Sequence, residues 1–326
     1  MRPILSITSK HFRYCTALSP PPLGKITSSP ILCSLGKQST RLFSTPSEDT
    51  TTTIEKSSSI KDTPLGTKKA SHLLKGLDVY EVLADDGHPI SVYGIHSQDL
   101  KNKSDDGIVR RPVLLLHGRT WSSVPVYHLM GGEEEKGKSR SLMETLFDAG
   151  LQPYCMDFRG FGGTPLDVTQ SVIPNRCVAD TESVLQFIAE RHDDELEEEG
   201  ASESESQHLP VLLGWSQGAL IAQLLAQKSP EIISKLVLYG SIYDPLVRYP
   251  RSPLFVNGTD VSERPKNTYN AAIEDFTVEG SIEPEPAAQF AEAALLTDPL
   301  NAPWNQLFQF NNVDPARVHV PTLVVS

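Results

Sequence analysis

The pentapeptide Gly-Trp-Ser-Gln-Gly at residues 214–218 separates two segments of different character. The apolar run LPVLL precedes it at 209–213, and the alanine- and leucine-rich run QGALIAQLLAQ follows at 217–227. A short apolar run bounded by glycine predicts a buried strand, whereas the longer run has the spacing of a helix. The pentapeptide is therefore predicted to form a sharp strand-to-helix turn with Ser216 at its apex.

The composition of this turn has a physical explanation and a chemical consequence. Gly214 and Gly218 keep side chains out of the crowded bend. The helix that begins after Ser216 presents free N–H groups and the positive end of its dipole at this position. Because these groups suit a negatively charged oxygen, Ser216 is the candidate nucleophile, and the backbone N–H of Gln217 is the first candidate donor to an oxyanion.

Apolar runs and helical patterns alternate along the rest of the chain. Two alternating runs around residues 85–87 predict a β-hairpin. Later strand-like runs and helical patterns follow one another in turn, the strands at 112–116, 151–156 and 236–239 and the helices at 141–150 and 178–192. Strands that alternate with helices predict an α/β fold with a doubly wound, mainly parallel sheet.

The chain is predicted to contain one folded domain, residues 77–326. Residues 48–76 are rich in serine, threonine and lysine without periodicity, and are predicted to be a linker. Within the domain, residues 246–312 lack the strand rhythm and are predicted to be a small lid. The acidic low-complexity run at 193–207 is predicted to be a solvated surface insertion.

Residues 1–47 contain six basic residues and no acidic one. An acid-free N-terminus rich in arginine and serine is typical of a disordered transit peptide, and RLFST at 41–45 is similar to a mitochondrial cleavage region. The mitochondrial matrix is the predicted location, with the plastid or the cytoplasm as alternatives, and an ordinary basic tail is the alternative to a transit peptide. Loss of the six positive charges would change the formal charge of −12 to −18.

Composition argues against several classes of function. A formal net charge of −12 is not that of a nucleic-acid-binding protein. No transmembrane segment is predicted, because no apolar run approaches the length of about 20 residues that a membrane helix needs. Cys155 and Cys177 are expected to be free thiols, and no cysteine and histidine cluster has zinc spacing, so no metal is predicted.

Three further motifs accompany the pentapeptide in a fixed order along the chain. They are LLLHGRTW at 114–121, MDFRGFGGTP at 156–165 and LVLYGS at 236–241. Together they resemble the α/β-hydrolase fold superfamily over residues 77–326, and within it the serine hydrolases of the esterase, lipase and haloperoxidase-like group. The resemblance implies Ser216 as nucleophile, the backbone N–H groups of Gln217 and Arg119 as oxyanion donors, and no cofactor.

The same resemblance implies structural roles for other residues of these motifs. His117 belongs to a His-Gly pair that packs under the oxyanion loop, the loop that carries Arg119. Asp157 and Arg159 are expected to form a buried ion pair that braces the glycine-rich turn within MDFRGFGGTP at 156–165. Trp121 either lines an acyl pocket or belongs to the core.

A serine hydrolase of this superfamily also needs an acid and a histidine, which follow the serine in that order. His319 is the one histidine after Ser216. It precedes the strand-like run at 320–325, and a strand spans about 17 to 20 Å, so His319 is predicted to lie at the wrong end of the sheet. Asp244 is a candidate acid. We therefore expect a C-terminally truncated hydrolase that lacks its catalytic histidine, last strand and last helix.

The function implied for the intact parent protein is hydrolysis of an ester, thioester or related acyl bond of a small molecule through a Ser216 acyl-enzyme. One alternative is a catalytically inactive interaction protein or isoform with the same fold. Another is a cofactor-free haloperoxidase-like or C–C bond hydrolase. An unfinished sheet would expose an apolar edge, through which self-association is expected. No motif indicates the substrate or the oligomeric state.

Overall fold

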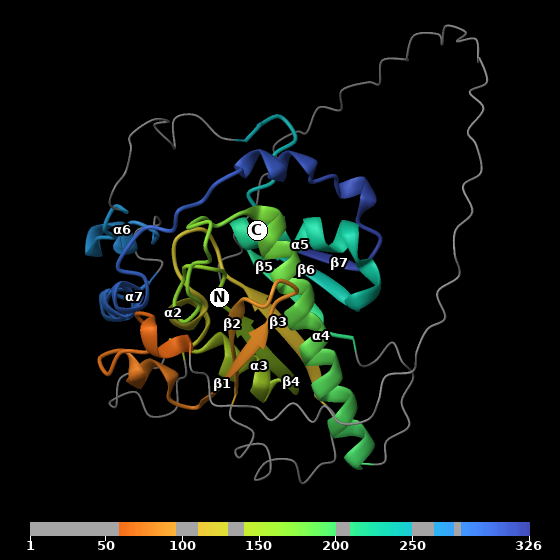
Figure 1. Ribbon diagram of the computed structural model, residues 1–326, viewed down its shortest axis with the longest axis horizontal. Coiled ribbons are helices and arrows are strands. Elements are labelled where there is room, and N and C mark those ends of the chain that lie inside the picture. The colour runs from red at the N-terminus through yellow and green to blue at the C-terminus, as the bar shows by residue number, and fades with distance from the viewer. Residues whose placement is uncertain (1–58, 96–109, 130–139, 200–208, 250–263, 277–281) are drawn as a thin grey trace, which may run out of the picture. The chain divides into compact units, whose positions relative to one another are not determined.

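The computed structural model describes residues 59–95, 110–129, 140–199, 209–249, 264–276 and 282–326 (Figure 1). The predicted transit peptide at 1–47 lies outside these residues, as do residues 200–207 of the acidic run and parts of the predicted lid. Among the helices of the described segments, none combines the length and the apolar character that a membrane crossing requires. Cys155 and Cys177 are buried free thiols, as predicted.

In the described segments, seven strands form one sheet in the order β1-β2-β4-β3-β5-β6-β7. The strands are β1 (Leu77–Leu83), β2 (Pro89–Ile95), β3 (Arg111–Leu116), β4 (Leu151–Met156), β5 (Val211–Trp215), β6 (Lys235–Tyr239) and β7 (Thr322–Val325). β2 is antiparallel to both of its neighbours, and the other strand pairs are parallel. The predicted α/β fold with a mainly parallel sheet is confirmed.

The predicted hairpin joins β1 to β2. Its turn is closed by two backbone hydrogen bonds, from Gly87 N–H to Ala84 O (2.8 Å) and from Ala84 N–H to His88 O (2.9 Å). Gly87 has a φ of +79°, a conformation that glycine adopts without strain. This turn brings Asp85 and Asp86 to the end of the sheet where the parallel strands finish, because β2 runs against β4.

Helices cover both faces of the sheet. They are α2 (Ser123–Tyr127), α3 (Leu142–Asp148), α4 (Pro174–Glu199), α5 (Gln217–Lys228), α6 (Tyr269–Ile273), α7 (Pro284–Thr297) and the short 3-10 helices η1 (Ser59–Asp62), η2 (Ser71–Leu74), η4 (Pro230–Ile232), η5 (Leu307–Asn312) and η6 (Pro315–Arg317).

The alternation of side chains along β3 explains the two layers. Leu114 and Leu116 belong to one buried cluster with α4 and α5, the helices in front of the sheet in Figure 1. Val113 and Leu115 belong to a second cluster with α2 and α3. Because successive strand residues point to opposite faces, a strand that is apolar throughout must be covered on both sides.

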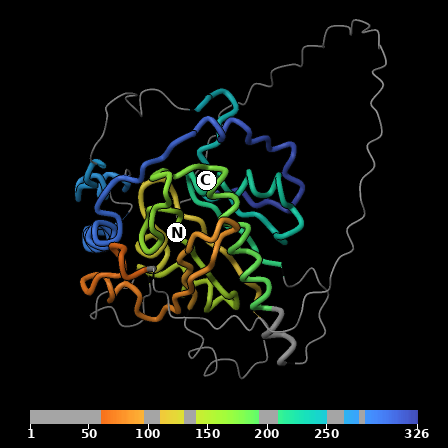
Figure 2. Tube along the Cα trace, in the orientation of Figure 1, coloured from red at the N-terminus to blue at the C-terminus, as the bar shows by residue number. Residues whose placement is uncertain are grey.

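Part of the predicted linker at 48–76 is instead folded, which corrects the sequence-based boundary. Residues 59–74 contain η1 and η2, and Leu65 and Ala70 are completely buried in the cluster with α2 and α3. Figure 2 shows this orange segment beside α7 in blue. Short 3-10 helices have no apolar periodicity, so a polar segment with a few buried side chains resembles a linker in sequence.

The predicted lid contributes α6 and α7. Both helices pack over Trp121, which is 1% exposed and meets the Phe290 ring edge-on at 6.2 Å between centroids. The Trp121 indole N–H donates to Asp275. Trp121 is therefore a core residue that attaches the lid helices, rather than the wall of an open pocket.

Candidate active site

Ser216 occupies the junction between β5 and α5 in a strained conformation. Its φ is 54° and its ψ is −117°, a region that costs an L-residue on the order of 1–3 kcal/mol. The turn is held from both sides, because Ser216 N–H donates to Tyr239 O at 3.0 Å and Ser216 O accepts from Ala219 N–H at 3.1 Å. The predicted strand-to-helix turn is confirmed, and its apex is the serine.

The two glycines of the pentapeptide are required by close backbone approaches. A Cβ on Gly214 would lie 2.5 Å from Gly218 O, and a Cβ on Gly218 would lie 2.4 Å from His117 O. Neither backbone oxygen can move aside as a flexible side chain could. The second approach also shows that the segment after β3 packs directly against the start of α5.

The free polar groups at this turn are those of Ser216 and Gln217. Gln217 is the first residue of α5, so its backbone N–H has no partner inside the helix. Within the described segments, neither this N–H nor the Ser216 hydroxyl has a hydrogen-bond partner. Gly118 lies beside them, since a Cβ at Gly118 would be 3.4 Å from the Ser216 Cβ. The loop after β3 therefore adjoins the serine.

His117 is buried, and both of its ring nitrogens are occupied. Nε2 lies 3.1 Å from the Phe158 N–H, which can only donate, so Nε2 accepts. Nδ1 must then carry the proton, and it donates to Gly118 O at 2.9 Å. Burial lowers the pKa of His117 to about 3. His117 is therefore a neutral structural residue, as predicted, and has no free nitrogen to accept a proton from Ser216.

The bond from His117 also orients the loop after β3. In a trans peptide the C=O and N–H groups point in opposite directions. Because Gly118 O points at the His117 ring, the N–H of Arg119, which belongs to the same peptide, points away from that ring. The next peptide is held by Trp304, whose indole N–H donates to Arg119 O at 2.9 Å.

Trp304 is a functional candidate that the sequence analysis missed. It lies among aromatic rings, with centroids 6.3 Å from Phe158 and 6.2 Å from Phe161. It stands 185 residues from its hydrogen-bond partner Arg119, in a segment without a motif. The one sequence signal for a functional role of Trp304 is that it is a tryptophan within the predicted lid.

His319 lies at the opposite end of the sheet from Ser216, as predicted. It is exposed and precedes β7, whose first residue, Thr322, pairs with Leu236 near the start of β6. Ser216 follows Trp215, which pairs with Tyr239 at the end of β6. The length of the sheet therefore separates the His319 imidazole from the serine.

Asp244 follows β6 at the same end of the sheet as Ser216. It is exposed, and its Oδ1 accepts from Leu246 N–H at 2.9 Å, which closes a short turn. Asp244 also lines a cavity of about 250 Å³ with Arg248. The described residues show no histidine bonded to its carboxylate, so its role as an acid stays a prediction.

Asp157 and Arg159 do not pair with each other, which corrects the expected ion pair. Asp157 is buried and accepts from the Tyr93 hydroxyl (2.7 Å) and from the backbone N–H groups of Ser123 (2.8 Å) and Gly163 (2.9 Å). Burial raises its pKa to about 7. The Asp157 side chain points to the start of α2, so it braces the glycine-rich turn without a cation.

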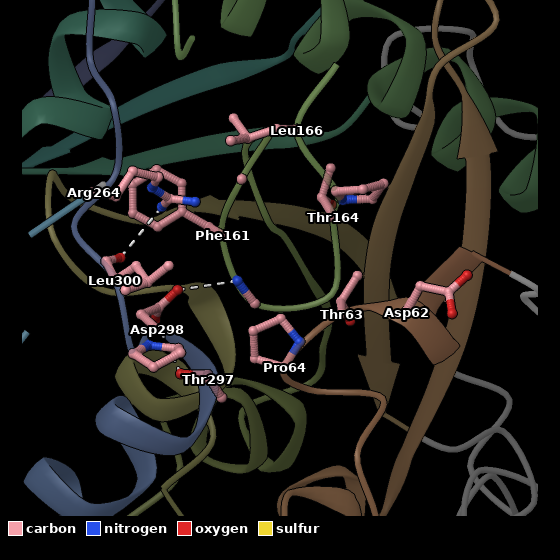
Figure 3. A pocket seen from close by; sticks show the side chains of 14 residues that line it. Asp62, Thr63, Pro64, Phe161, Thr164, Leu166, Arg264, Thr297, Asp298 and Leu300 are labelled. Atoms are coloured by element: carbon pink, nitrogen blue, oxygen red, sulfur yellow. Dashed lines mark hydrogen bonds between the residues drawn. The ribbon is translucent and has the colours of Figure 1, made fainter. Parts of the chain in front are cut away.

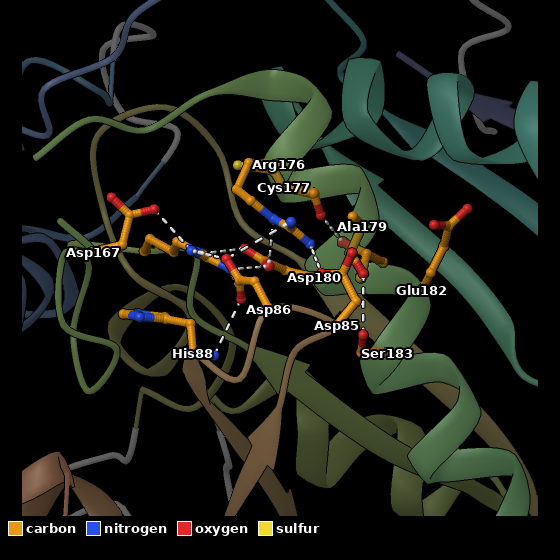
Figure 4. A network of polar contacts seen from close by, with 12 residues as sticks. Asp85, Asp86, His88, Asp167, Arg176, Cys177, Ala179, Asp180, Glu182 and Ser183 are labelled. Carbon is orange, nitrogen blue, oxygen red and sulfur yellow. Dashed lines mark hydrogen bonds and ion pairs between the residues drawn. The ribbon is translucent and has the colours of Figure 1, made fainter. Parts of the chain in front are cut away.

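Arg159 instead forms ion pairs with three carboxylates on another side of the turn. They belong to Asp86, Asp167 and Asp180, which are labelled in Figure 4. Its guanidinium nitrogens lie 2.8 Å from Asp86, 2.8 Å from Asp167 and 2.7 Å from Asp180. The Arg159 hydrogen bond holds the pKa of Asp86 well below its usual range. Arg159 therefore ties the β1–β2 hairpin, the glycine-rich turn and α4 together.

This cluster is also where carboxylates come close enough for a metal ion. Oxygens of Asp85, Asp86 and Asp180 lie within 4.8 Å of one another. The guanidinium groups of Arg159 and Arg176 already bond to these oxygens. The three carboxylates are thus already paired with the guanidinium groups of the chain itself. The cluster does not offer the unpaired carboxylates that a divalent ion would need.

Comparisons with known proteins bear on the family of this chain. A model of the alpha/beta hydrolase family matches residues 113–326. A Saccharomyces cerevisiae protein named "Probable alcohol acetyltransferase" is 29% identical over 146 residues, which are 44% of this chain and 34% of that protein. The match thus spans about a third of the length of this curated relative.

Two solved structures are among those to which this chain is similar. The thioesterase domain from the curacin biosynthetic pathway is 14% identical with a TM-score of 0.46, over 76% of this chain and 82% of that chain. Naproxen esterase from Bacillus subtilis is 14% identical with a TM-score of 0.44, over 78% of this chain and 76% of that chain.

Proposed function

This chain belongs to the alpha/beta hydrolase family, and on that premise we propose that it cleaves an ester, thioester or related acyl bond of a small molecule through an acyl-enzyme on Ser216. The observation that carries the proposal is the conformation of Ser216. A positive φ at a non-glycine residue is costly, and here it sets the hydroxyl beside the free N–H of an α-helix.

The proposed reaction has two steps. Ser216 Oγ attacks the carbonyl carbon of the substrate while a base takes the hydroxyl proton, and the carbonyl oxygen becomes negative. The backbone N–H groups of Gln217 and Arg119 stabilise that oxygen. Its collapse expels the alcohol or thiol, which takes up the proton, and water then releases the acid from Ser216 by the same route.

The base is the component of this mechanism that we do not find among the described residues. Both ring nitrogens of His117 are engaged, and His319 lies at the far end of the sheet. The proposal therefore includes an imidazole supplied from outside the described segments, with Asp244 as the candidate acid inside them.

Because no base is found beside Ser216 among the described residues, added imidazole provides a direct test. In a p-nitrophenyl ester assay, imidazole should raise the hydrolysis rate of the wild-type chain above that of Ser216→Ala, because a small base can occupy the site beside the serine. The difference between the two proteins should saturate with imidazole and follow its neutral fraction as pH rises. Equal rates of wild type and Ser216→Ala at every imidazole concentration would contradict the proposal.

A second candidate function is that of an inactive interaction protein with the same fold. The lack of a base for Ser216 among the described residues favours it. That function predicts no Ser216-dependent rate, even with imidazole. A C–C bond hydrolase would share the same serine and would differ in the groups that line its substrate pocket.

Transfer of the acyl group to an alcohol instead of water is a third candidate, favoured by the yeast relative. The first step is the same, and only the acceptor differs. Ethanol added to the imidazole assay should then yield ethyl ester in a Ser216-dependent manner, detected by gas chromatography. The mitochondrial location expected from residues 1–47 stays a prediction, because these residues lie outside the described part of the chain.

A further inference from the structure

A second cavity, of about 200 Å³, lies among three separate parts of the chain (Figure 3). Residues 62–64 form one side, the glycine-rich turn at 160–166 forms another, and Arg264 with residues 297–300 closes it from the predicted lid. Neither Ser216 nor the loop after β3 contributes to its wall. This cavity is thus distinct from the serine site.

Arg264 is the cation in the wall of this cavity, and its partners are neutral. Its Nε donates to Asn301 O at 2.8 Å and one Nη donates to Leu300 O at 3.3 Å. Partial burial lowers the pKa of Arg264. In the described part of the chain, no carboxylate forms an ion pair with it. A partly desolvated guanidinium bonded to carbonyl oxygens alone retains a donor for an anion.

The two acids of the wall do not satisfy this cation. Asp298 is buried, and its oxygens accept from the N–H groups of Ser122 (2.8 Å) and Gly162 (3.0 Å) and from the Thr297 hydroxyl (3.0 Å). In Figure 3 the Asp62 carboxylate points away from Arg264. The Asp298 carboxylate therefore bonds mainly to backbone N–H groups. Its charge weakens the attraction of Arg264 for an anion but does not take the place of the anion.

The rest of the wall is largely apolar and includes Pro64, Phe161, Leu166 and Leu300. Sites for drug-sized ligands measure about 300–1,000 Å³, so this cavity accepts only a smaller molecule. We propose that the cavity binds a short-chain organic carboxylate, with the carboxylate on Arg264 and the alkyl chain against Phe161 and Leu166.

A ligand in this cavity would be one side chain away from the oxyanion loop. The Phe161 ring forms part of the wall and packs on the His117 ring at 4.5 Å between centroids. It also lies 6.2 Å from Trp304, which holds Arg119 O. The fluorescence of Trp304 is therefore expected to respond when the cavity fills, and it provides a local signal of binding.

The test uses the full chain, sodium butyrate as ligand and butyramide as its neutral counterpart. Butyrate should raise the thermal midpoint and change the tryptophan fluorescence with a dissociation constant in the millimolar range, whereas butyramide should do neither. Arg264→Gln should weaken butyrate binding at least tenfold. Arg248→Gln is the matched control, because Arg248 is an exposed arginine of the same predicted lid that does not line this cavity.

Two outcomes would overturn the proposal: equal responses to butyrate and butyramide, or wild-type affinity in Arg264→Gln. Should the glutamine variant fail to fold, Arg264→Lys replaces it and should bind butyrate more weakly than wild type but still prefer it to butyramide. Ser216→Ala should bind butyrate as the wild type does. Loss of binding in that variant would place butyrate at the serine and contradict the second site, whatever the fate of the proposed hydrolase activity.

Discussion

Ser216 keeps a conformation that only its surroundings can enforce. The close approaches at Gly214 and Gly218 and the bond to Tyr239 O leave the chain no other route from β5 into α5. The strain is local, and the groups that it positions are the serine hydroxyl and the free Gln217 N–H. At the residue scale, the candidate site is therefore a serine beside the free Gln217 N–H. The proposed second donor, the Arg119 N–H, belongs to the peptide whose oxygen accepts from His117.

The indole of Trp304 is predicted to contribute to the orientation of that second donor. Trp304→Phe keeps an aromatic ring against Phe158 and Phe161 but removes the N–H that donates to Arg119 O. A hydrogen bond of this kind contributes about 1 kcal/mol. We expect the imidazole-assisted, Ser216-dependent rate to fall several-fold, with a small change in thermal midpoint. A rate equal to that of wild type would show that the loop does not depend on the indole.

The buried carboxyl of Asp157 predicts a defined pH dependence of stability. Burial raises its pKa from 3.8 to about 7, so the folded chain binds this proton more tightly than the unfolded chain. The resulting stabilisation is complete below about pH 4 and is lost as the pH rises through 7. The unfolding free energy of wild type minus that of Asp157→Asn should therefore increase as the pH falls from 8 to 5.

Urea unfolding at each pH measures this difference, and Asp62→Asn is a suitable control because Asp62 is an exposed aspartate. For Asp62→Asn, the difference in unfolding free energy from wild type should stay nearly constant from pH 8 to pH 5. A decrease towards pH 5 in the unfolding free energy of wild type minus that of Asp157→Asn would contradict the prediction. It would mean that the three donors around Asp157 keep its carboxylate ionised in the folded chain at low pH.

At the scale of the element, β7 is the least protected part of the sheet. It pairs with β6 on one side, and Leu323 and Val324 are 59% and 63% exposed. In the described residues no strand covers its other edge. An exposed apolar edge strand is a template for pairing with another chain, so we expect this chain to self-associate through β7.

A charge on β7 should reduce that association. Val324→Lys places a cation on the edge strand and should increase the monomer fraction in size-exclusion chromatography with light scattering. Val168→Lys is the matched control, because Val168 is 98% exposed but lies in a loop. A wild-type chain that is monomeric at all concentrations would refute the prediction, and so would an equal effect of the control.

The elements themselves differ in how visible they are in sequence. The apolar runs of β3 and β5 and the spacing of α5 and α7 carry a periodicity that follows from burial, so the mainly parallel sheet and its elbow could be predicted. η1 and η2 could not, because a single turn of 3-10 helix has too few residues to show a period.

Long-range side-chain partners were the least predictable part of the site. Asp157 and Arg159 are two residues apart in a motif, yet they point to opposite sides of the turn. Each has one nearby partner, Gly163 for Asp157 and Asp167 for Arg159, and its other partners lie 21 to 73 residues away. Which carboxylate meets which arginine depends on how the hairpin and α4 pack, and sequence spacing does not contain that information.

At the scale of the whole described domain, the sheet gathers the candidate chemistry at one end. The parallel strands β3, β4, β5 and β6 finish there, and the loop of Gly118, the glycine-rich turn, Ser216 and Asp244 follow them in that order. Ligands of open α/β sheets bind at this end. The cavity at Arg264 lies beside the glycine-rich turn, next to the aromatic residues that contact the loop after β3.

Covalent labelling distinguishes a nucleophilic Ser216 from an inert one. The chain is treated with a fluorophosphonate, with and without imidazole, and its peptides are mapped by mass spectrometry. A nucleophilic Ser216 should give a single label on the peptide that contains it, formed faster with imidazole and absent in Ser216→Ala. Label spread over other serines, or an equal amount in Ser216→Ala, would show that the strained serine at this elbow has no nucleophilic role.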